Sequence, residues 1–531
     1  MPTRPPRAPV PSQAPVLVSV LALVCVVQMG IAQPLAPFES DTWSTPESGI
    51  DTRVLSALKA KGLEPARPCS DEVFVRRVHL DVIGTLPEPE AVRAFLQDTD
   101  PRKRAALIDA LLERPEYADY WALKWCDLLR VKAEFPSNLW PNAVQAYHRW
   151  IRGVVAENRP YDEFTRELLT SSGSNFRVPP VNFYRAAQSR EPAGLAEVVA
   201  LTFMGTRLAA WPAEQRDNLA AFFSRAAYKK TEEWKEEIVY LSLEPTTPLE
   251  LTFPDGAKAT VAVGDDPRIA FTDWLAAPGN PWFSRCIANR VWYWLMGRGI
   301  VHEPDDIRPD NPPANPELIA YLEQELVASE FDLKHLFRLI LNSRTYQQSA
   351  LPRSEAPEAE ALFAYYPVRR LDAEVLIDAL DWVGGTGQSY ASPIPEPFTY
   401  IPEDQRSIAL ADGSITSLFL ELFGRPPRAT GLESERSNQP SDAQRLYLLN
   451  STDVQRRVAR SPHLRRAAIA ARGDRAQLIR EVYLILLSRA PTSAEQAAAE
   501  AYYGTPDLSP EDAATDLAWA LVNSMEFLYR H

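Results

Sequence analysis

Amphipathic patterns between Asp265 and Ser349 restrict the fold of this chain more than any other feature. From 267 to 296, apolar side chains recur every three or four residues, and a Pro-Gly-Asn-Pro turn interrupts them. At Asn315-Pro316-Glu317, a capping amide precedes a proline suited to the first helical position and a carboxylate suited to the positive helix end. A third pattern starts after Asp332. This segment therefore predicts a compact block of helices.

The rest of the chain is helical by the same criterion, with one exception. Between residues 236 and 264, apolar residues alternate with period two around Pro254-Asp255-Gly256, which is typical of strands joined by a turn. The 531 residues can bury at least two cores, and 47 prolines against 21 glycines favour helices joined by stiff turns. We predict a mainly α, multi-helix protein with two helical domains, 51–235 and 265–531, and a small β-insertion at 236–264 between them.

Several finer predictions concern single elements. We expect one helix from Phe183 to Phe203 and a last helix from Pro510 to Tyr529. Aromatic residues between Tyr120 and Val131 have helix spacing and are expected in the core. The run Gly384-Gly385-Thr386-Gly387 lacks the preceding strand and the Lys-Ser/Thr ending of a phosphate loop, so it predicts a flexible linker.

Residues 1–32 have the parts of a secretory signal peptide. Arg4 and Arg7 form a basic start, residues 16–27 form an apolar run, and Gly30-Ile31-Ala32 supplies small residues for cleavage. We expect export to the periplasm, the cell envelope or the extracellular space, with no stable transmembrane span after cleavage. A retained membrane anchor is the alternative, although the apolar run is short for a span. Residues 33–50 resemble a flexible lead-in.

Charge and cysteine content exclude some classes of function. The formal charge is −14, and loss of Arg4 and Arg7 with the signal segment makes it −16. Such acidity disfavours binding to nucleic acid or to an anionic membrane surface. Cys69, Cys126 and Cys286 then remain, and they can form at most one disulfide. Three buried thiols are the favoured interpretation.

The chain resembles a pair of known domains. The central block resembles the planctomycete-specific domain through Asn289-Arg290-Val291-Trp292, Gly297-Arg298-Gly299, Asp305-Asp306 and the stretches 311–318 and 331–347. Upstream, residues 76–87 and 117–121 resemble the planctomycete cytochrome-c-associated domain. Together the two resemblances cover most of the mature chain. Neither domain has a settled activity.

Two cysteine motifs that members of this family typically carry are missing. The family's Cys-x-x-Cys-His-x-His-Pro stretch follows Phe-x-Gly-x-Arg-Leu, but here the segment 203–208 leads into Ala209-Ala210-Trp211-Pro212. Leu432 and Ser434 stand where a Cys-x-Cys-Glu-Arg-Ser motif has its cysteines. Thiolates and imidazoles at such spacings bind zinc, iron or haem. Because both motifs are lost together, we expect that they form one site in the relatives and that this chain holds no cofactor or metal.

The remaining site candidates are polar residues that match the family pattern. As a functional set they would line a cleft, with carboxylates that share a proton or hold sugar hydroxyls and arginines that clamp an anionic group. As a structural set, which we favour, they would be helix caps and buried salt bridges. The catalytic candidates are Asp305, Asp306 and Glu435, and the binding candidates are Arg290, Arg298, Asn315, Asn342, Arg344, Tyr346 and Arg436. An open groove with Asp305 or Asp306 about 5 to 10 Å from Glu435 would favour glycosidase chemistry.

These observations predict an exported envelope protein of unknown activity with a noncatalytic binding or assembly role. A polysaccharide or an envelope protein is the expected partner, and the resemblance implies a secreted sulfatase-like family as another. A hydrolase acting on envelope or environmental carbohydrate is the alternative, although the chain has no Gly-x-Ser-x-Gly elbow. A redox or haem role, which the family name suggests, has no ligands to support it.

Overall fold

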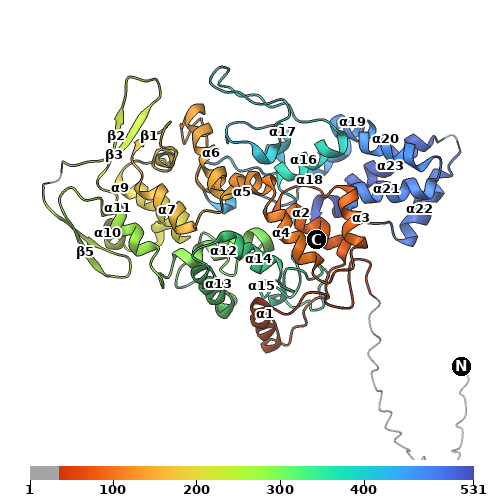
Figure 1. Cartoon of the computed structure of the whole chain (residues 1–531), viewed down its shortest axis with the longest axis horizontal. Helices are drawn as coiled ribbons and strands as arrows, with labels where there is room; N and C mark the ends of the chain where they lie inside the picture. The colour runs from red at the N-terminus through yellow and green to blue at the C-terminus, as the bar shows by residue number, and fades with distance from the viewer. Residues whose placement is uncertain (1–34, 245, 507) are drawn as a thin grey trace, which may run out of the picture. The chain divides into compact units, whose positions relative to one another are not determined.

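The fold is mainly α, as the sequence predicts (Figure 1). The computed structural model describes residues 35–244, 246–506 and 508–531, so the predicted signal segment at 1–32 lies outside the described residues. Residues Pro37–His531 form one compact unit. The division of this unit at 236 and 264 stays a prediction. Within the described ranges, no helix has both the length and the apolar character needed to cross a membrane.

Helices make up most of this unit. Its first half contains α1 (Gly49–Ala60), α2 (Asp71–Val82), α3 (Pro89–Gln97), α4 (Lys103–Leu112), α5 (Pro115–Leu128), α6 (Pro141–Ala156), α7 (Tyr161–Thr170), α8 (Asn182–Arg185), α9 (Pro192–Val199) and α10 (Ala213–Ala221). Its second half contains α11 (Pro267–Leu275), α12 (Phe283–Met296), α13 (Pro316–Ala328), α14 (Leu333–Leu341), α15 (Glu358–Ala361), α16 (Ala373–Gly384), α17 (Leu418–Leu422), α18 (Asp442–Asn450), α19 (Thr452–Ala459), α20 (Pro462–Ala471), α21 (Arg475–Leu487), α22 (Ser493–Tyr503), α23 (Pro510–Val522) and α24 (Met525–Leu528).

The helices predicted around the proline-rich turn are all present. Residues 278–281 separate α11 from α12, and Asn315 and Asp332 cap α13 and α14. The Asn315 Oδ1 atom accepts the backbone N–H of Leu318 at 3.0 Å, and the Asp332 carboxylate accepts that of His335 at 2.9 Å. Each cap satisfies an N–H group that the first helical turn leaves free. Helix α12 packs against both α13 and α14 (Figure 1).

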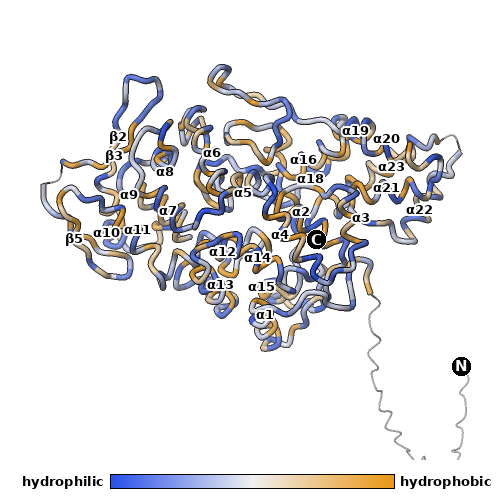
Figure 2. The backbone as a smooth tube through the Cα atoms, viewed as in Figure 1, coloured by the Kyte–Doolittle hydropathy of each residue, from blue (hydrophilic) through white to orange (hydrophobic). Residues whose placement is uncertain are grey.

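The aromatic residues of α5 lie in the core, as predicted. Trp121 and Trp125 are buried, and their ring centroids lie 5.4 and 5.9 Å from that of Trp294 on α12. The Trp121 ring also lies 4.4 Å from Phe337 on α14. Tilted and edge-on aromatic pairs of this kind add to the stability gained from burial. Figure 2 shows hydrophobic and hydrophilic residues interspersed along the backbone of the whole unit.

The β-structure is more extensive than predicted. β1 (Gly173–Ser174), β2 (Ala226–Lys230) and β3 (Glu237–Leu241) form an antiparallel sheet in the order β1-β3-β2. β4 (Leu249–Thr252) pairs only with β5 (Lys258–Val261) among the described strands. Strands therefore occur at 173–174 and 226–230, ahead of the predicted start at 236. The sequence of β2 did not indicate a strand because Tyr228 is its single residue with high strand preference, and pairing with β3 supplies the rest.

The helix predicted from Phe183 to Phe203 is interrupted. α8 ends at Arg185, and the helical path resumes only at Pro192 as α9. The residue before a proline is sterically disfavoured in the helical region, which explains why Glu191 is extended.

The C-terminal helix predicted from Pro510 to Tyr529 is also divided. Ser524 accepts the backbone N–H of Phe527 and starts a new short helix, α24. The chain then leaves the helix as β7 (Tyr529–Arg530), which pairs with β6 (Arg369–Arg370). This pairing places Arg530 in the interior.

The described part of the predicted flexible lead-in is instead held by distant residues. Glu39 forms an isolated β-bridge with Cys69, and Thr45 Oγ1 donates to Gln347 Oε1 at 2.6 Å. The Arg344 guanidinium lies over the ring of Trp43. The last two contacts involve side chains more than two hundred residues away, so the local composition of the lead-in could not reveal them.

Asp51 joins α1 to the central block and provides a test of this fold. Its buried carboxylate accepts backbone N–H groups of Ser48, Arg344 and Thr345 at 2.8, 3.1 and 2.8 Å. In Asp51→Ala these donors lose their acceptor, so we expect the free energy of unfolding in urea to fall by about 3 kcal/mol or more. Asp109→Ala removes an exposed carboxylate partner of an arginine and should cost less than about 1 kcal/mol. Equal losses in the two variants would contradict the assignment.

Candidate functional site

Most binding candidates from the sequence have structural partners in separate parts of the fold. The asparagines lie at helix ends, and the others bond to backbone or side-chain groups near them. The contacts are Asn315 with Leu318 N (3.0 Å), Asn342 with Arg338 O (2.9 Å), Arg344 with Thr45 O (2.9 Å), Tyr346 with Asp81 (2.8 Å) and Arg298 with Glu360 (3.9 Å). These five residues do not converge on one cleft.

The three catalytic candidates lie in three different environments. Asp305 is buried, and Arg290 Nη2 donates to its Oδ1 atom at 2.7 Å. Asp306 lies 3.0 Å from Arg308. Glu435 accepts the backbone N–H groups of residues 429 and 430 at 3.1 and 2.6 Å and so closes a turn. A buried carboxylate paired with arginine is the arrangement expected of a structural role.

The flanks of the two missing cysteine motifs meet at the Arg290–Asp305 ion pair. Arg290 donates to the backbone carbonyls of Leu201 and Thr202, which directly precede the 203–208 stretch that leads into the first motif position. The Asp305 Oδ2 atom accepts the backbone N–H of Glu433, which stands inside the second motif, at 2.7 Å. One pair of charges therefore contacts both segments, as expected if the two motifs form one site in the relatives.

Arg436 belongs to a second set of buried ion pairs. It donates to Asp127 and Glu374 at 2.6 Å each, and the adjacent Asp372 accepts a bond from Lys124 at 2.9 Å. Burial alone would raise the pKa of Asp372, but Lys124 and two arginines outweigh burial and hold this pKa well below its usual range. These charges satisfy one another, so they form part of the protein core.

The cysteines do not form a site of their own. Cys69, Cys126 and Cys286 are buried and unpaired. Burial raises the pKa of Cys126 to about 12 and that of Cys286 to about 11, so both are thiols at neutral pH. In the described part of the chain, no three His, Cys, Asp or Glu side chains are grouped so as to hold a metal ion. The expected absence of a cofactor stays a prediction.

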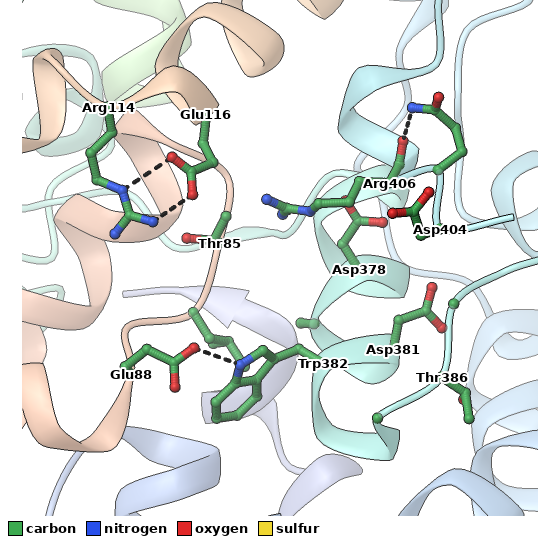
Figure 3. A pocket seen from close by; sticks show the side chains of 15 residues that line it. Thr85, Glu88, Arg114, Glu116, Asp378, Asp381, Trp382, Thr386, Asp404 and Arg406 are labelled. Atoms are coloured by element: carbon green, nitrogen blue, oxygen red, sulfur yellow. Dashed lines mark hydrogen bonds and ion pairs between the residues drawn. The ribbon is translucent and has the colours of Figure 1, made fainter. Parts of the chain in front are cut away.

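An open pocket of about 390 Å³ offers a site that the sequence analysis did not identify (Figure 3). It lies between the start of α5, the second half of α16 and the loop 404–406. One tryptophan, five carboxylates and two arginines line it. They are Trp382, the carboxylates Glu88, Glu116, Asp378, Asp381 and Asp404, and the arginines Arg114 and Arg406.

Charged groups lie on opposite sides of this pocket (Figure 3). On one side, Arg114 donates two hydrogen bonds to Glu116, at 3.1 and 2.5 Å. On the other side, Asp378 accepts the backbone N–H groups of residues 407 and 408 at 2.8 and 3.2 Å, and Arg406 lies 3.5 Å from it. The pocket thus presents fixed donors and acceptors from two directions.

The Trp382 ring is held in place between these groups. Its indole N–H donates to Glu88 at 2.9 Å, and its ring lies 4.1 Å from the His463 imidazole. An aromatic ring beside carboxylates and guanidinium groups offers an apolar face together with hydrogen-bonding partners, which is the usual composition of a small-molecule site.

Carboxylates of the pocket have pKa shifts of opposite sign. Burial raises the pKa of Asp381 to about 7, with Asp378 adding to the rise and Arg457 opposing it. Hydrogen bonds from Arg114 lower the pKa of Glu116. Asp381 also accepts a direct hydrogen bond from Arg457, so its raised pKa reflects burial that outweighs a charged partner, whereas Glu116 is held in its ionised form.

A local signal for part of this pocket was present in the sequence. Asp378 and Asp381 are three residues apart, a spacing that places both on one helix face, and Trp382 follows directly. The Gly384–Gly387 run, predicted to be a linker, ends α16 and contributes to the pocket wall. Arg114 and Glu116 come from a segment more than two hundred residues earlier, so no spacing rule could associate them with α16.

Two family models match this chain. Residues 49–233 match the family model PSCyt2, "Protein of unknown function (DUF1549)", and residues 267–503 match PSD1, "Protein of unknown function (DUF1553)". The chain belongs to the family in which these two domains follow one another in this order, as the sequence resemblance predicts. No curated protein and no solved structure matches it.

The two shifted carboxyl groups predict opposite effects of pH on stability. The pKa of Asp381 is raised in the folded state, so the unfolded chain binds fewer protons than the folded chain between about pH 4 and 7. The free energy of unfolding therefore falls as the pH rises through that range. Asp381→Asn cannot titrate at this position. As the pH rises from 4 to 7, the free energy of unfolding of the variant should therefore increase by about 1 kcal/mol or more relative to that of the wild type.

Glu116→Gln is the matched control, with the opposite sign. Because the folded-state pKa of Glu116 is lowered, its stabilising effect is present above the unfolded pKa and is lost as pH falls. The deficit of this variant should therefore shrink on acidification. Urea titrations from pH 3 to 8 measure both differences, and parallel pH profiles for the two variants would contradict the assignment.

Proposed function

We propose that this protein is an exported, noncatalytic component of the cell envelope that binds polysaccharide in the pocket of Figure 3. The supporting observation is that one pocket combines the Trp382 ring with charged side chains on two sides. A sugar ring presents apolar C–H groups on its face and hydroxyl groups at its edge. An aromatic surface flanked by donors and acceptors complements both parts.

The charge of the pocket limits which glycans it can bind. Five carboxylates and two arginines line the pocket, and both arginines lie beside carboxylates of the pocket itself. This excess of negative charge repels uronates and sulfated sugars and favours neutral sugars.

Trp382→Ala tests the binding proposal. Loss of the ring should weaken the affinity for neutral oligosaccharides by about tenfold, measured by calorimetry on ligands selected from a glycan array. Trp382→Phe should keep most of the affinity because an aromatic face remains. Trp234→Ala removes an exposed tryptophan outside the pocket and serves as the control. Unchanged affinity in Trp382→Ala would refute the proposal.

Export is the other part of the proposal and has its own test. The basic, apolar and small-residue segments of 1–32 support it. Protein recovered from the envelope fraction should start at Gln33 on N-terminal sequencing. A chain that retains Met1 would contradict cleavage and favour the anchored alternative.

A carbohydrate hydrolase is the second candidate, and the opposite pKa shifts of Asp381 and Glu116 favour it. In glycoside hydrolysis, one protonated carboxyl group donates to the leaving oxygen while an ionised carboxylate acts as base or nucleophile. Asp381 would be the acid and Glu116 the base. Asp381→Asn should then lower sugar release by more than about 100-fold while oligosaccharide binding persists. Sugar release by the wild type but not by Asp381→Asn would replace the noncatalytic role with a hydrolase. If neither protein releases sugar, the noncatalytic role is supported.

A further inference from the structure

A second cavity, the arginine cleft, borders the buried ion pairs around Arg436. Its volume is about 460 Å³, and it shares no lining residue with the pocket of Figure 3. Five cations and three carboxylates line it. The cations are Lys124, Arg369, Arg370, Arg436 and Arg530, and the carboxylates are Asp372, Glu433 and Glu303.

Four of these five cations have carboxylate partners. Each pair is close enough for a charge-assisted hydrogen bond. Lys124 pairs with Asp372 (2.9 Å), Arg369 with Asp81 (2.9 Å), Arg436 with Glu374 (2.6 Å) and Arg530 with Asp81 (2.8 Å).

Arg370 is the exception, with no ion pair to any described carboxylate. It is 3% exposed, and its Nη2 atom donates to the carbonyls of Phe423 and Ser437 at 2.6 and 2.9 Å. Its Nε and Nη1 atoms are buried without a hydrogen-bond partner in the described structure, as is Nη1 of Arg369. A buried cation with unsatisfied N–H groups destabilises a protein unless an anion or polar group supplies acceptors.

The whole network around the cleft has the same imbalance. Buried charges are normally matched by charges of opposite sign. Among its buried and half-buried groups, eight cations stand against six carboxylates; the exposed Glu303 pairs instead with Arg207. The cations are Lys124, Arg290, Arg369, Arg370, Arg425, Arg428, Arg436 and Arg530, and the carboxylates are Asp81, Asp127, Asp305, Asp372, Glu374 and Glu433. Glu433 widens the imbalance, because burial and Asp305 raise its pKa to about 7.

We propose that the arginine cleft binds an oxyanion, namely a carboxylate, sulfate or phosphate group, with Arg370 and Arg369 as the residues that gain a partner. Guanidinium groups suit such anions because they donate parallel, charge-assisted hydrogen bonds. The carboxylates in the wall already accept bonds from protein donors: Asp372 from Asn438 at 2.8 Å, and Glu433 from Trp294 at 2.8 Å. This site is independent of the glycan pocket and takes the opposite charge.

Two exposed residues allow a test that leaves the buried network intact. Ser434 and Gln439 line the cleft at its surface, and neither side chain forms a hydrogen bond within the described residues. Ser434→Trp should fill the entrance. Gln439→Lys and Gln439→Glu change the charge at the rim in opposite directions. Ser493→Trp, at an exposed position of α22 outside the cleft, is the matched control.

The experiment compares melting temperatures of the full mature chain in sodium sulfate, phosphate or glucuronate with those in sodium chloride at equal ionic strength. We expect at least one oxyanion to raise the melting temperature by several degrees, and the strongest of the three identifies the class of ligand. The rise should vanish in Ser434→Trp and persist in Ser493→Trp. Gln439→Lys should tighten the dissociation constant about threefold, and Gln439→Glu should weaken it by a similar factor.

Arg370→Met gives a complementary readout from inside the cleft. Because it removes the cation without a carboxylate partner, it should abolish the oxyanion effect while Trp382-dependent glycan binding stays unchanged. Equal melting temperatures in all salts would overturn the proposal. A rise that Ser434→Trp retains would also overturn it, because the ion would then be adventitious and bound elsewhere. Should Arg370→Met fail to fold, the Ser434 and Gln439 variants decide the outcome.

Discussion

Buried arginine–carboxylate pairs connect parts of this chain that are hundreds of residues apart. Arg436 bonds to Asp127, which precedes it by 309 residues, and Arg428 bonds to the same carboxylate. Removing one member of such a pair leaves an uncompensated buried charge, which typically costs about 3 to 5 kcal/mol. The segments matched by the two family models therefore depend on each other for their charge balance. The two segments also share one hydrophobic core, and Pro37–His531 accordingly forms one compact unit although two domain models describe it.

Helix α16 transmits this constraint to the pocket. Asp372 and Glu374, at its start, belong to the ion network, while Asp378 and Trp382, further along, line the pocket of Figure 3. A helix that is pinned at one end by several charged partners has a fixed position and rotation. The aromatic ring and carboxylates at its other end are therefore preorganised, which lowers the entropy lost when a ligand binds. Helix α16 is therefore part of both the ion network and the pocket.

An element of this structure can be predicted from the sequence where the residues that determine it lie within a few positions of each other. The caps at Asn315 and Asp332 are local, and both predicted helices start where expected. Pro192 is also a local signal, because it marks the boundary at which the single helix predicted from 183 to 203 is interrupted. The strand at 226–230 depends on its partner β3 and had no local signature.

The candidate site shows the same limit. Arg290, Asp305 and Arg436 were recognised as polar residues of the family pattern, but whether they lay in a cleft or in the interior depended on partners such as Asp127, far away in the sequence. The pocket residues come from the start of α5, from α16 and from three loops, at 85–88, 385–387 and 404–406. Groups such as Asp378–Asp381–Trp382 are close in sequence, but nothing local indicates that these segments meet.

The position of Arg530 has a consequence for the order of events during synthesis. This residue donates to Tyr120, 410 residues earlier, and lies 2.8 Å from Asp81. While a ribosome is still translating, Asp81 and Asp372 lack one of the cations that compensate them, so the early helices cannot reach their final, dry packing. The buried ion network is therefore complete only after residue 530 has been synthesised.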